Sequence, residues 1–146
     1  MTTSHPTSPV AVITGGARGI GLAIGQWFLA HGHKVVLLDI DKATLDATEQ
    51  QLARPDDVLC LHTDVSQPEQ VQAAAAKVLE RFGRVDALVN NAGVLRDRMF
   101  ISLSEDDWDQ VMRVHLKGHF AMLHHAAAYW KAQSKAGDQP NAAVIN

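Results

Sequence analysis

The sequence predicts an α/β fold in which helices cover both faces of a parallel sheet, a doubly wound arrangement. Short apolar runs alternate with helix-period stretches along the chain. The runs are continuous in Val, Ile and Leu, as expected for strands buried on both faces. A glycine-rich turn follows the first run and opens the first helix. Together these observations favour a layered α/β domain over an all-helical or all-strand one.

Length and charge restrict the function. The chain has 146 residues, 47% of them hydrophobic, with 13 basic against 16 acidic side chains. We expect one globular domain over residues 9–146, preceded by a loose polar tail at 1–8. No basic stripe is present, which argues against nucleic-acid partners. A single cysteine, a start without signal-peptide character, and no apolar run of about 20 residues predict a cytoplasmic protein that does not span a membrane.

The first three strand and helix pairs have clear boundaries. Strands are expected at 9–14, 34–40 and 58–63, each followed by a helix. Gly32 and Gly83 stand where the first and third helices end, and Pro68 opens the third. The apolar stripe expected to face the sheet comprises, in the first helix, Ile20, Ala23, Ile24, Trp27 and Phe28, and in the third, Val71, Ala75, Val78, Leu79 and Phe82.

The remaining chain predicts a fourth strand at 86–91, a long helix and a fifth strand at 141–146. Ser104 is the expected N-cap of the long helix, three acidic residues follow it, and Gly137 ends it. Its apolar stripe is wider than one sheet face requires; it contains Trp108, Val111, Met112, Leu116, Phe120 and Leu123.

The glycine-rich turn, TGGARGIG from Thr14, is the main candidate for a binding site. Gly15, Gly19 and Gly21 allow a tight turn, close approach of a ligand to the backbone and close helix packing. A helix N-terminus at the carboxyl edge of a parallel sheet directs N–H groups and the positive end of the helix dipole at one place. A pyrophosphate suits that place, so the turn predicts dinucleotide binding in a Rossmann-type sheet. The alternative is a glycine-rich packing turn.

Asp39 ends the second strand, close to the spacing of about 20 residues expected for an acid that binds the adenosine ribose hydroxyls. A carboxylate there repels a 2′-phosphate, so we expect NAD in preference to NADP. Arg18 favours the opposite, because a guanidinium beside the turn can pair with a phosphate; it can equally lie over the adenine or face solvent. Taken alone, Asp39 also suits a helix N-cap.

The motifs TGGARGIG, Asp39, Asp64-Val65 and NNAG from Asn90, in this order, resemble the short-chain dehydrogenases/reductases over residues 9 to 146. The resemblance implies a strand order of 3-2-1-4-5 and hydride transfer between a nicotinamide cofactor and an alcohol or ketone. It implies adenine contacts from Asp64 and Val65, and a backbone contact from Ile20 to the pyrophosphate. It places Asn91, Ala92 and Gly93 beside the nicotinamide ribose. The full expected cofactor site is Gly15, Arg18, Gly19, Ile20, Gly21, Asp39, Asp64, Val65, Asn91, Ala92 and Gly93.

The stretch GVLRDRMF, with VHLKG further on, is similar to the hydroxyacyl-CoA dehydrogenase domains of multifunctional enzymes and to 3-oxoacyl-carrier-protein reductases. This likeness implies a 3-hydroxyacyl thioester as one possible substrate. Most of the family has Asn where this chain has His115. A histidine can also hydrogen-bond a proton-relay water, so His115 is the candidate catalytic residue. His115 and His119 have zinc-ligand spacing, but no Glu or Cys completes a set, and we expect no metal.

The family's catalytic Ser and Tyr-x-x-x-Lys do not occur in this sequence. Tyr129 is the only tyrosine, and Gln133 stands four residues beyond it. We therefore expect the chain to be the N-terminal, cofactor-binding half of such an enzyme, truncated after the fifth strand and inactive alone. The alternative is a non-catalytic nucleotide-binding or assembly module. In relatives the long helix packs against its equivalent in a second subunit, which implies a homo-oligomer.

Overall fold

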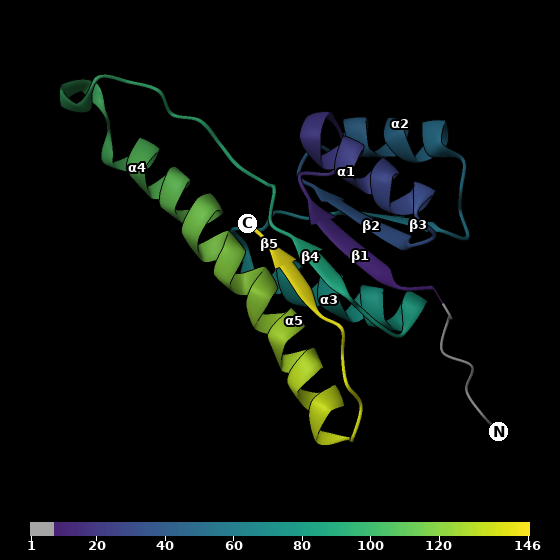
Figure 1. Cartoon of the computed structure of the whole chain (residues 1–146). Helices are drawn as coiled ribbons and strands as arrows, with labels where there is room; N and C mark the ends of the chain where they lie inside the picture. Colours follow the sequence, from purple (N-terminus) through teal and green to yellow (C-terminus); the bar gives the residue numbers. More distant parts are fainter. Residues whose placement is uncertain (1–7) are drawn as a thin grey trace.

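The computed structural model describes residues 8–146, so the expected tail at 1–8 lies almost wholly outside the described residues. Five parallel strands form one sheet in the order β3-β2-β1-β4-β5, which confirms the predicted fold class (Figure 1). The strands are β1 (Val10–Thr14), β2 (Lys34–Asp39), β3 (Val58–His62), β4 (Ala87–Val89) and β5 (Ala143–Ile145). The helices are α1 (Gly19–Ala30), α2 (Lys42–Leu52), α3 (Pro68–Phe82), η1 (Phe100–Ser102), α4 (Glu105–Val111), η2 (Met112–Lys117) and α5 (Gly118–Lys135).

Helices cover both faces of the sheet, with α1 and α2 on one face and α3 and α5 on the other (Figure 1). Alternate residues of β1 serve the two layers. Val10 and Val12 pack in the core beneath α3 and α5, whereas Ala11 and Ile13 pack beneath α1 and α2. All of β1 is buried, and burying a side chain such as Ile13 contributes about 1.5–3 kcal/mol. The continuous apolar strands therefore do have two covered faces.

The predicted stripe on α1 was partly wrong: Phe28 is buried and Ile24 packs against the core, but the rest of the stripe is exposed. Ile20 and Trp27 are exposed, and the helix buries Gly21, Gly25, Phe28 and Leu29. The cause is close helix–sheet packing: a Cβ at Gly25 would lie only 2.9 Å from the Cδ2 of Leu37 in β2. Glycine carries no hydrophobic signal, so the periodicity missed the face that approaches the sheet most closely.

The predicted helix boundaries are confirmed. Gly32 and Gly83 have φ values of +80° and +72°, and Pro68 is the first residue of α3. Ser104 caps α4: its Oγ accepts the Asp107 N–H at 3.0 Å and the Asp107 carboxylate accepts the Ser104 N–H at 3.3 Å. This reciprocal pair is a capping box.

The long helix after Ser104 is continuous but changes its winding. Residues 112–117 form one π-helical stretch between α4 and α5. Just after it, Gly118 lies so close to the segment between β3 and α3 that a Cβ there would be 2.9 Å from the Cγ2 of Val65. Toward the end of α5, the Trp130 indole N–H donates to the Val85 carbonyl oxygen at 2.8 Å. Within residues 8–146, no helix is long and apolar enough to span a bilayer.

Candidate functional site

The glycine turn between β1 and α1 has the conformation that its residues predict. Gly15 and Gly19 are left-handed, with φ of +64° and +57°. Gly21 has no space for a side chain, because a Cβ there would lie 2.1 Å from the Gly15 carbonyl oxygen. At Gly19 a Cβ would meet nothing within 4 Å. All three glycines therefore shape the turn, and Gly19 also keeps the space in front of it open.

No side chain in the described part of the chain caps the N-terminus of α1. Arg18 stands at the N-cap position in an extended conformation without a side-chain cap bond. A helix of 12 residues thus presents unpaired N–H groups and the positive end of its dipole at the turn. This arrangement suits a phosphate group.

Asp39 lies at the carboxyl end of β2, facing the turn. Its Oδ2 accepts the Ala17 N–H at 3.0 Å, and its Oδ1 accepts the Asp41 N–H at 2.9 Å. These bonds hold the carboxylate at the edge of the sheet beside the glycine turn. The N-cap of α2 is Asp41, whose Oδ1 accepts the Thr44 N–H, so the capping role that Asp39 also suited belongs to its neighbour.

The ends of β3 and β4 complete the edge. Asp64 Oδ1 accepts both the N–H and the hydroxyl of Ser66, at 2.9 and 2.7 Å, which forms a tight turn before α3. Val65 is buried against Gly118. Asn90 is also buried, and its Nδ2 donates to the Asn146 side-chain oxygen at 2.8 Å, joining the ends of β4 and β5.

Thr14, which the sequence analysis did not single out, organises this edge. Its hydroxyl oxygen accepts the N–H groups of Asn91 and Ala92 at 3.0 and 2.9 Å. The Asn91 side-chain amide donates to the carbonyl oxygens of Thr14 and Gly15 at 3.1 and 3.2 Å. The side-chain amide of Asn91 therefore donates its hydrogen bonds to the glycine turn. The only signal in the sequence was a buried strand that ends in Thr directly before the glycines.

One cavity of about 360 Å³ opens at this edge of the sheet. It brings together most of the residues expected to bind a cofactor: Gly15, Arg18, Asp39, Asp64, Val65, Asn91, Ala92 and Gly93. Gly19, Ile20 and Gly21 do not line it, and the Ile20 side chain is exposed. Residues not foreseen also form its wall; these are Leu38, Ile40, Thr63, Val94 and Val114.

His115 lies in the π-helical stretch and packs against the loop after β4. A Cβ at Gly93 would lie 2.7 Å from its Cε1. Its Nε2 is 3.0 Å from the Val94 nitrogen and 2.9 Å from the Val94 oxygen, so it accepts or donates according to its tautomer. Nδ1 is the ring nitrogen of His115 with no hydrogen-bond partner in residues 8–146. His115 therefore holds the loop as well as standing near the cavity.

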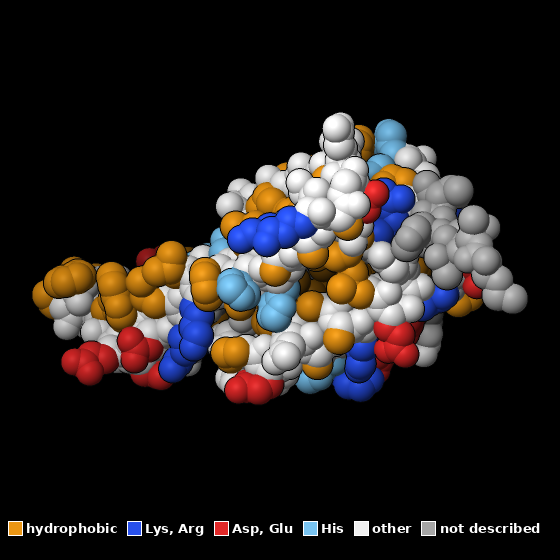
Figure 2. Space-filling view, turned by 90° about the horizontal axis from the view of Figure 1, so that it is seen from below, with side chains coloured by type: hydrophobic (Ala, Val, Ile, Leu, Met, Phe, Trp, Pro, Cys, Tyr) orange, Lys and Arg blue, Asp and Glu red, His pale blue; other side chains and the backbone are white. Residues whose placement is uncertain are grey.

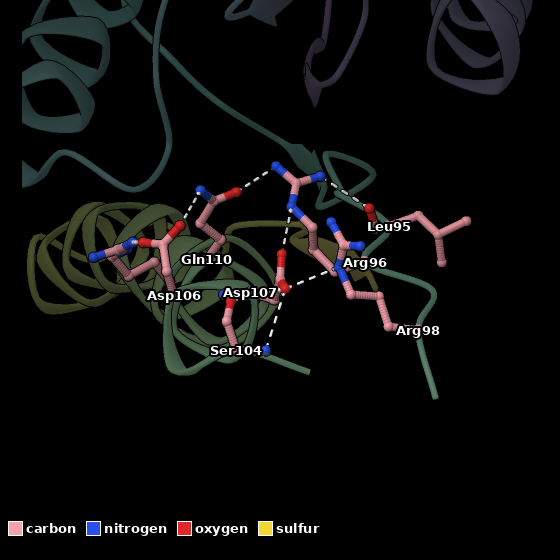
Figure 3. Close-up of polar contacts among 8 residues, drawn as sticks. Leu95, Arg96, Arg98, Ser104, Asp106, Asp107 and Gln110 are labelled. Atoms are coloured by element: carbon pink, nitrogen blue, oxygen red, sulfur yellow. Dashed lines mark hydrogen bonds and ion pairs between the residues drawn. The ribbon is translucent and has the colours of Figure 1, made fainter. Parts of the chain in front are cut away.

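The same loop is tied to α4 by a polar cluster (Figure 3). The buried Asp107 carboxylate accepts from Arg98 at 3.0 Å and lies 3.6 Å from Arg96. Arg96 also donates to the side chain of Gln110. The hydrogen bonds from Ser104, followed by the Arg98 guanidinium, lower the pKa of Asp107. These contacts anchor the segment that follows the cavity.

Tyr129 lies apart from the cavity. The Tyr129 hydroxyl donates to the Gly83 carbonyl oxygen at 3.4 Å, before β4 begins and so at the opposite edge of the sheet. Burial and the nearby Asp86 raise the pKa of Tyr129. In residues 8–146 no group of three or more His, Cys, Asp or Glu side chains is placed to hold a metal ion.

Comparison with known proteins agrees with this geometry. Residues 9–145 match the family model described as short chain dehydrogenase. The chain belongs to the short-chain dehydrogenase family. The family's parallel sheet and flanking helices are those of Figure 1.

Curated relatives in the short-chain dehydrogenase family extend beyond this chain. An uncharacterized oxidoreductase of Mycobacterium bovis is 42% identical over 125 residues, which are 86% of this chain and 51% of the relative. A 3-oxoacyl-[acyl-carrier-protein] reductase of Thermotoga maritima is 35% identical over 138 residues, covering 94% of this chain and 54% of the relative. A hydroxyacyl-CoA dehydrogenase of Mycobacterium tuberculosis is 37% identical over 140 residues, covering 91% and 44%. The chain thus spans about half the length of these relatives.

Among solved structures, a 3-ketoacyl-(acyl-carrier-protein) reductase from Brucella melitensis, complexed with NADH, superposes with a TM-score of 0.83 at 30% identity. The match covers 90% of this chain and 54% of that one. A short-chain dehydrogenase from Novosphingobium aromaticivorans gives a TM-score of 0.85 at 33% identity, covering 90% and 49%.

Proposed function

We propose that this chain binds NAD(H) and forms the cofactor-binding part of an oxidoreductase that interconverts a secondary alcohol and a ketone. One observation carries the proposal: Arg18, the N-cap residue of the uncapped helix α1, and Asp39 line the same cavity. Membership in the short-chain dehydrogenase family supports a nicotinamide cofactor, and the NADH complex of the Brucella melitensis relative supports NAD(H).

The cavity and the start of α1 beside it together fit each part of a dinucleotide. The N–H groups at the start of α1, around Gly19, Ile20 and Gly21, would hold the pyrophosphate. Asp39 would accept hydrogen bonds from the adenosine ribose hydroxyls. When bound, the nicotinamide ring supplies the hydride donor or acceptor.

The adenine and nicotinamide ends of the dinucleotide would contact different loops. Asp64 and Val65 would border the adenine. Asn91, Ala92 and Gly93 would border the nicotinamide ribose, with Asn91 acting through its hold on the glycine turn. His115 would position this loop through Val94, and its Nδ1 would be available to a proton-relay water.

The substrate class follows from the relatives rather than from the cavity. Two of them are named for 3-oxoacyl-carrier-protein reduction and hydroxyacyl-CoA dehydrogenation. We therefore infer a 3-hydroxyacyl or 3-oxoacyl thioester for the whole enzyme.

Titration with NADH and NADPH, followed by nicotinamide fluorescence, tests the cofactor proposal. NADH should bind more tightly. Asp39→Ala should weaken NADH binding about tenfold or more, because a hydrogen bond to a charged group contributes about 1.5–3 kcal/mol. Asp57→Ala, which removes a carboxylate far from the cavity lining, is the control. Tighter binding of NADPH to the wild type would refute the assignment of Asp39.

A second function, nucleotide binding without catalysis, is favoured by one observation. No tyrosine is followed by lysine four residues later, and Tyr129 donates to Gly83 away from the cavity. Neither function gives this chain turnover of its own. The 146-residue chain should bind NADH yet form none from NAD and a secondary alcohol or hydroxyacyl thioester, since general acid–base groups contribute about 10²–10⁴-fold in rate. Measurable turnover would place an acid or base within this chain.

We also propose that the chain self-associates. Trp108, Met112, Leu116 and Phe120 follow one another at intervals of one turn along α4, η2 and α5, and all four are exposed. Hydrophobic side chains also gather at the end of the molecule that carries η1 and α4 (Figure 2). Met99, Phe100 and Ile101 are exposed there. Apolar patches of this kind mark association surfaces.

A further inference from the structure

Two contacts connect the glycine turn to the start of α2. The Ala17 N–H donates to Asp39, and the next residue, Arg18, forms an ion pair with Asp41 in which Nη1 and Oδ2 are 3.5 Å apart. Arg18 and Asp39 both line the cavity. The guanidinium, with a side chain 74% exposed, is therefore held on the Asp39 side of the cavity by a carboxylate two residues further along.

The Asp41 carboxylate is fixed independently of Arg18. Its Oδ1 accepts the Thr44 N–H at 3.1 Å and its Oδ2 accepts the Thr44 hydroxyl at 2.7 Å. These bonds to Thr44, with a smaller contribution from Arg18, lower the pKa of Asp41. Asp41 is thus a charged partner at neutral pH that Thr44 holds in place, and the exposed Arg18 side chain pairs with it.

We propose that Asp41 determines cofactor specificity by occupying Arg18. A free guanidinium beside the adenosine ribose would bind the 2′-phosphate of NADP, since guanidinium and phosphate form paired, charge-assisted hydrogen bonds. With Asp41 in place, a 2′-phosphate has to displace an existing ion pair and meets two carboxylates for one guanidinium. The proposal rests on the proposed function, and it explains how a chain with arginine in its glycine turn discriminates against NADP.

Asp41→Ser is the informative variant, because serine still caps α2 but is uncharged and too short to hold Arg18. The measurement is the ratio of the NADPH and NADH dissociation constants for four forms of the chain: wild type, Asp41→Ser, Arg18→Ala and the double variant. Asp46→Ser is the matched control, since it removes a carboxylate of α2 that pairs with Lys42 outside the cavity lining. Thermal unfolding of each variant checks the α2 cap, and Asp41→Asn replaces Asp41→Ser if the serine variant does not fold.

For Asp41→Ser, we expect the ratio of the NADPH to the NADH dissociation constant to fall about tenfold, which means relatively tighter NADPH binding. This is the size of one charge contact near a protein surface. Adding Asp41→Ser to the Arg18→Ala variant should not lower this ratio further. The control Asp46→Ser should leave the ratio near the wild-type value. Equal falls in both backgrounds would overturn the proposal, because Asp41 would then repel the phosphate directly. An unchanged ratio in Asp41→Ser would overturn it too. Failure of the wild type to bind NADH would instead remove the proposed function, and this inference with it.

Discussion

The Asn91 side-chain amide lies 3.2 Å from the Gly15 carbonyl oxygen and ties the loop after β4 to the glycine turn after β1. The same amide reaches the Thr14 carbonyl oxygen at 3.1 Å. A residue expected to face the nicotinamide ribose thus also determines the shape of the turn expected to hold the pyrophosphate.

Replacing Asn91 should disturb that turn. In Asn91→Asp a carboxylate would face two carbonyl oxygens with no donor between them, whereas Asn91→Ala only loses the bonds. We expect a loss of about 1–3 kcal/mol in the free energy of unfolding for Asn91→Ala and a larger loss for Asn91→Asp. Urea unfolding measures both. An aspartate variant as stable as the wild type would contradict the hydrogen bonds described for Asn91.

Substitutions of Gly19 and Gly21 should have different effects on stability and on cofactor binding. Gly21→Ala would force a Cβ against the Gly15 carbonyl oxygen, so we expect at least about 1–3 kcal/mol of lost stability. Gly19→Ala adds a side chain in open space at positive φ, which should cost about 1 kcal/mol and obstruct a bound pyrophosphate.

Gly32→Ala is the matched control for Gly19→Ala, because Gly32 also has positive φ and open surroundings but lies beyond the end of α1. Unfolding and NADH titration should show similar stability losses for the two variants and weaker NADH binding for Gly19→Ala alone. Equal NADH affinity in both would argue against a ligand at the α1 N-terminus.

Asp107 should make stability depend on acid pH. Its pKa is lowered in the folded state, so its contribution to stability is present above the unfolded value of about 3.9 and is lost as the pH falls through the folded pKa. Asp107→Asn should be less stable near neutrality and lose less stability below about pH 4. Urea unfolding between these conditions measures the difference. Asp109→Asn, at an exposed site on α4, serves as the control. If Asp109→Asn reduced the loss of stability at acid pH as much as Asp107→Asn does, the effect would not be specific to Asp107.

Self-association should depend on the exposed helix face. Leu116→Glu with Phe120→Glu places two charges on side chains that are 62% and 65% exposed, so the fold should persist. By sedimentation we expect the wild type to associate at micromolar concentration and the double variant to be monomeric. Ala128→Glu changes another exposed position of α5 and should leave association intact. A monomeric wild type at micromolar concentration would disprove the interface.

Much of the fold could be predicted because each element carries its own signal. Continuous Val, Ile and Leu runs marked the strands, and Pro68, Gly83, Ser104 and Gly137 marked helix ends through local backbone chemistry. The prediction of the buried face of α1 was partly wrong because Gly21 and Gly25 pack against the sheet without hydrophobic side chains. The π-helical turn at 112–117 has no pattern that distinguishes it from α-helix.

The sequence by itself determined the strand and helix order, the glycines at the first turn and an acid at the end of the second strand. Only the tertiary structure decided which partners the polar side chains at this edge have. Asn91 hydrogen-bonds Gly15, Asp41 forms an ion pair with Arg18, and His115 hydrogen-bonds Val94. The physical reason is range. Backbone conformation and burial follow from near neighbours in the chain, whereas the partner of a side-chain donor is set by which strands lie side by side, and β1 and β4 pair across more than seventy residues of sequence.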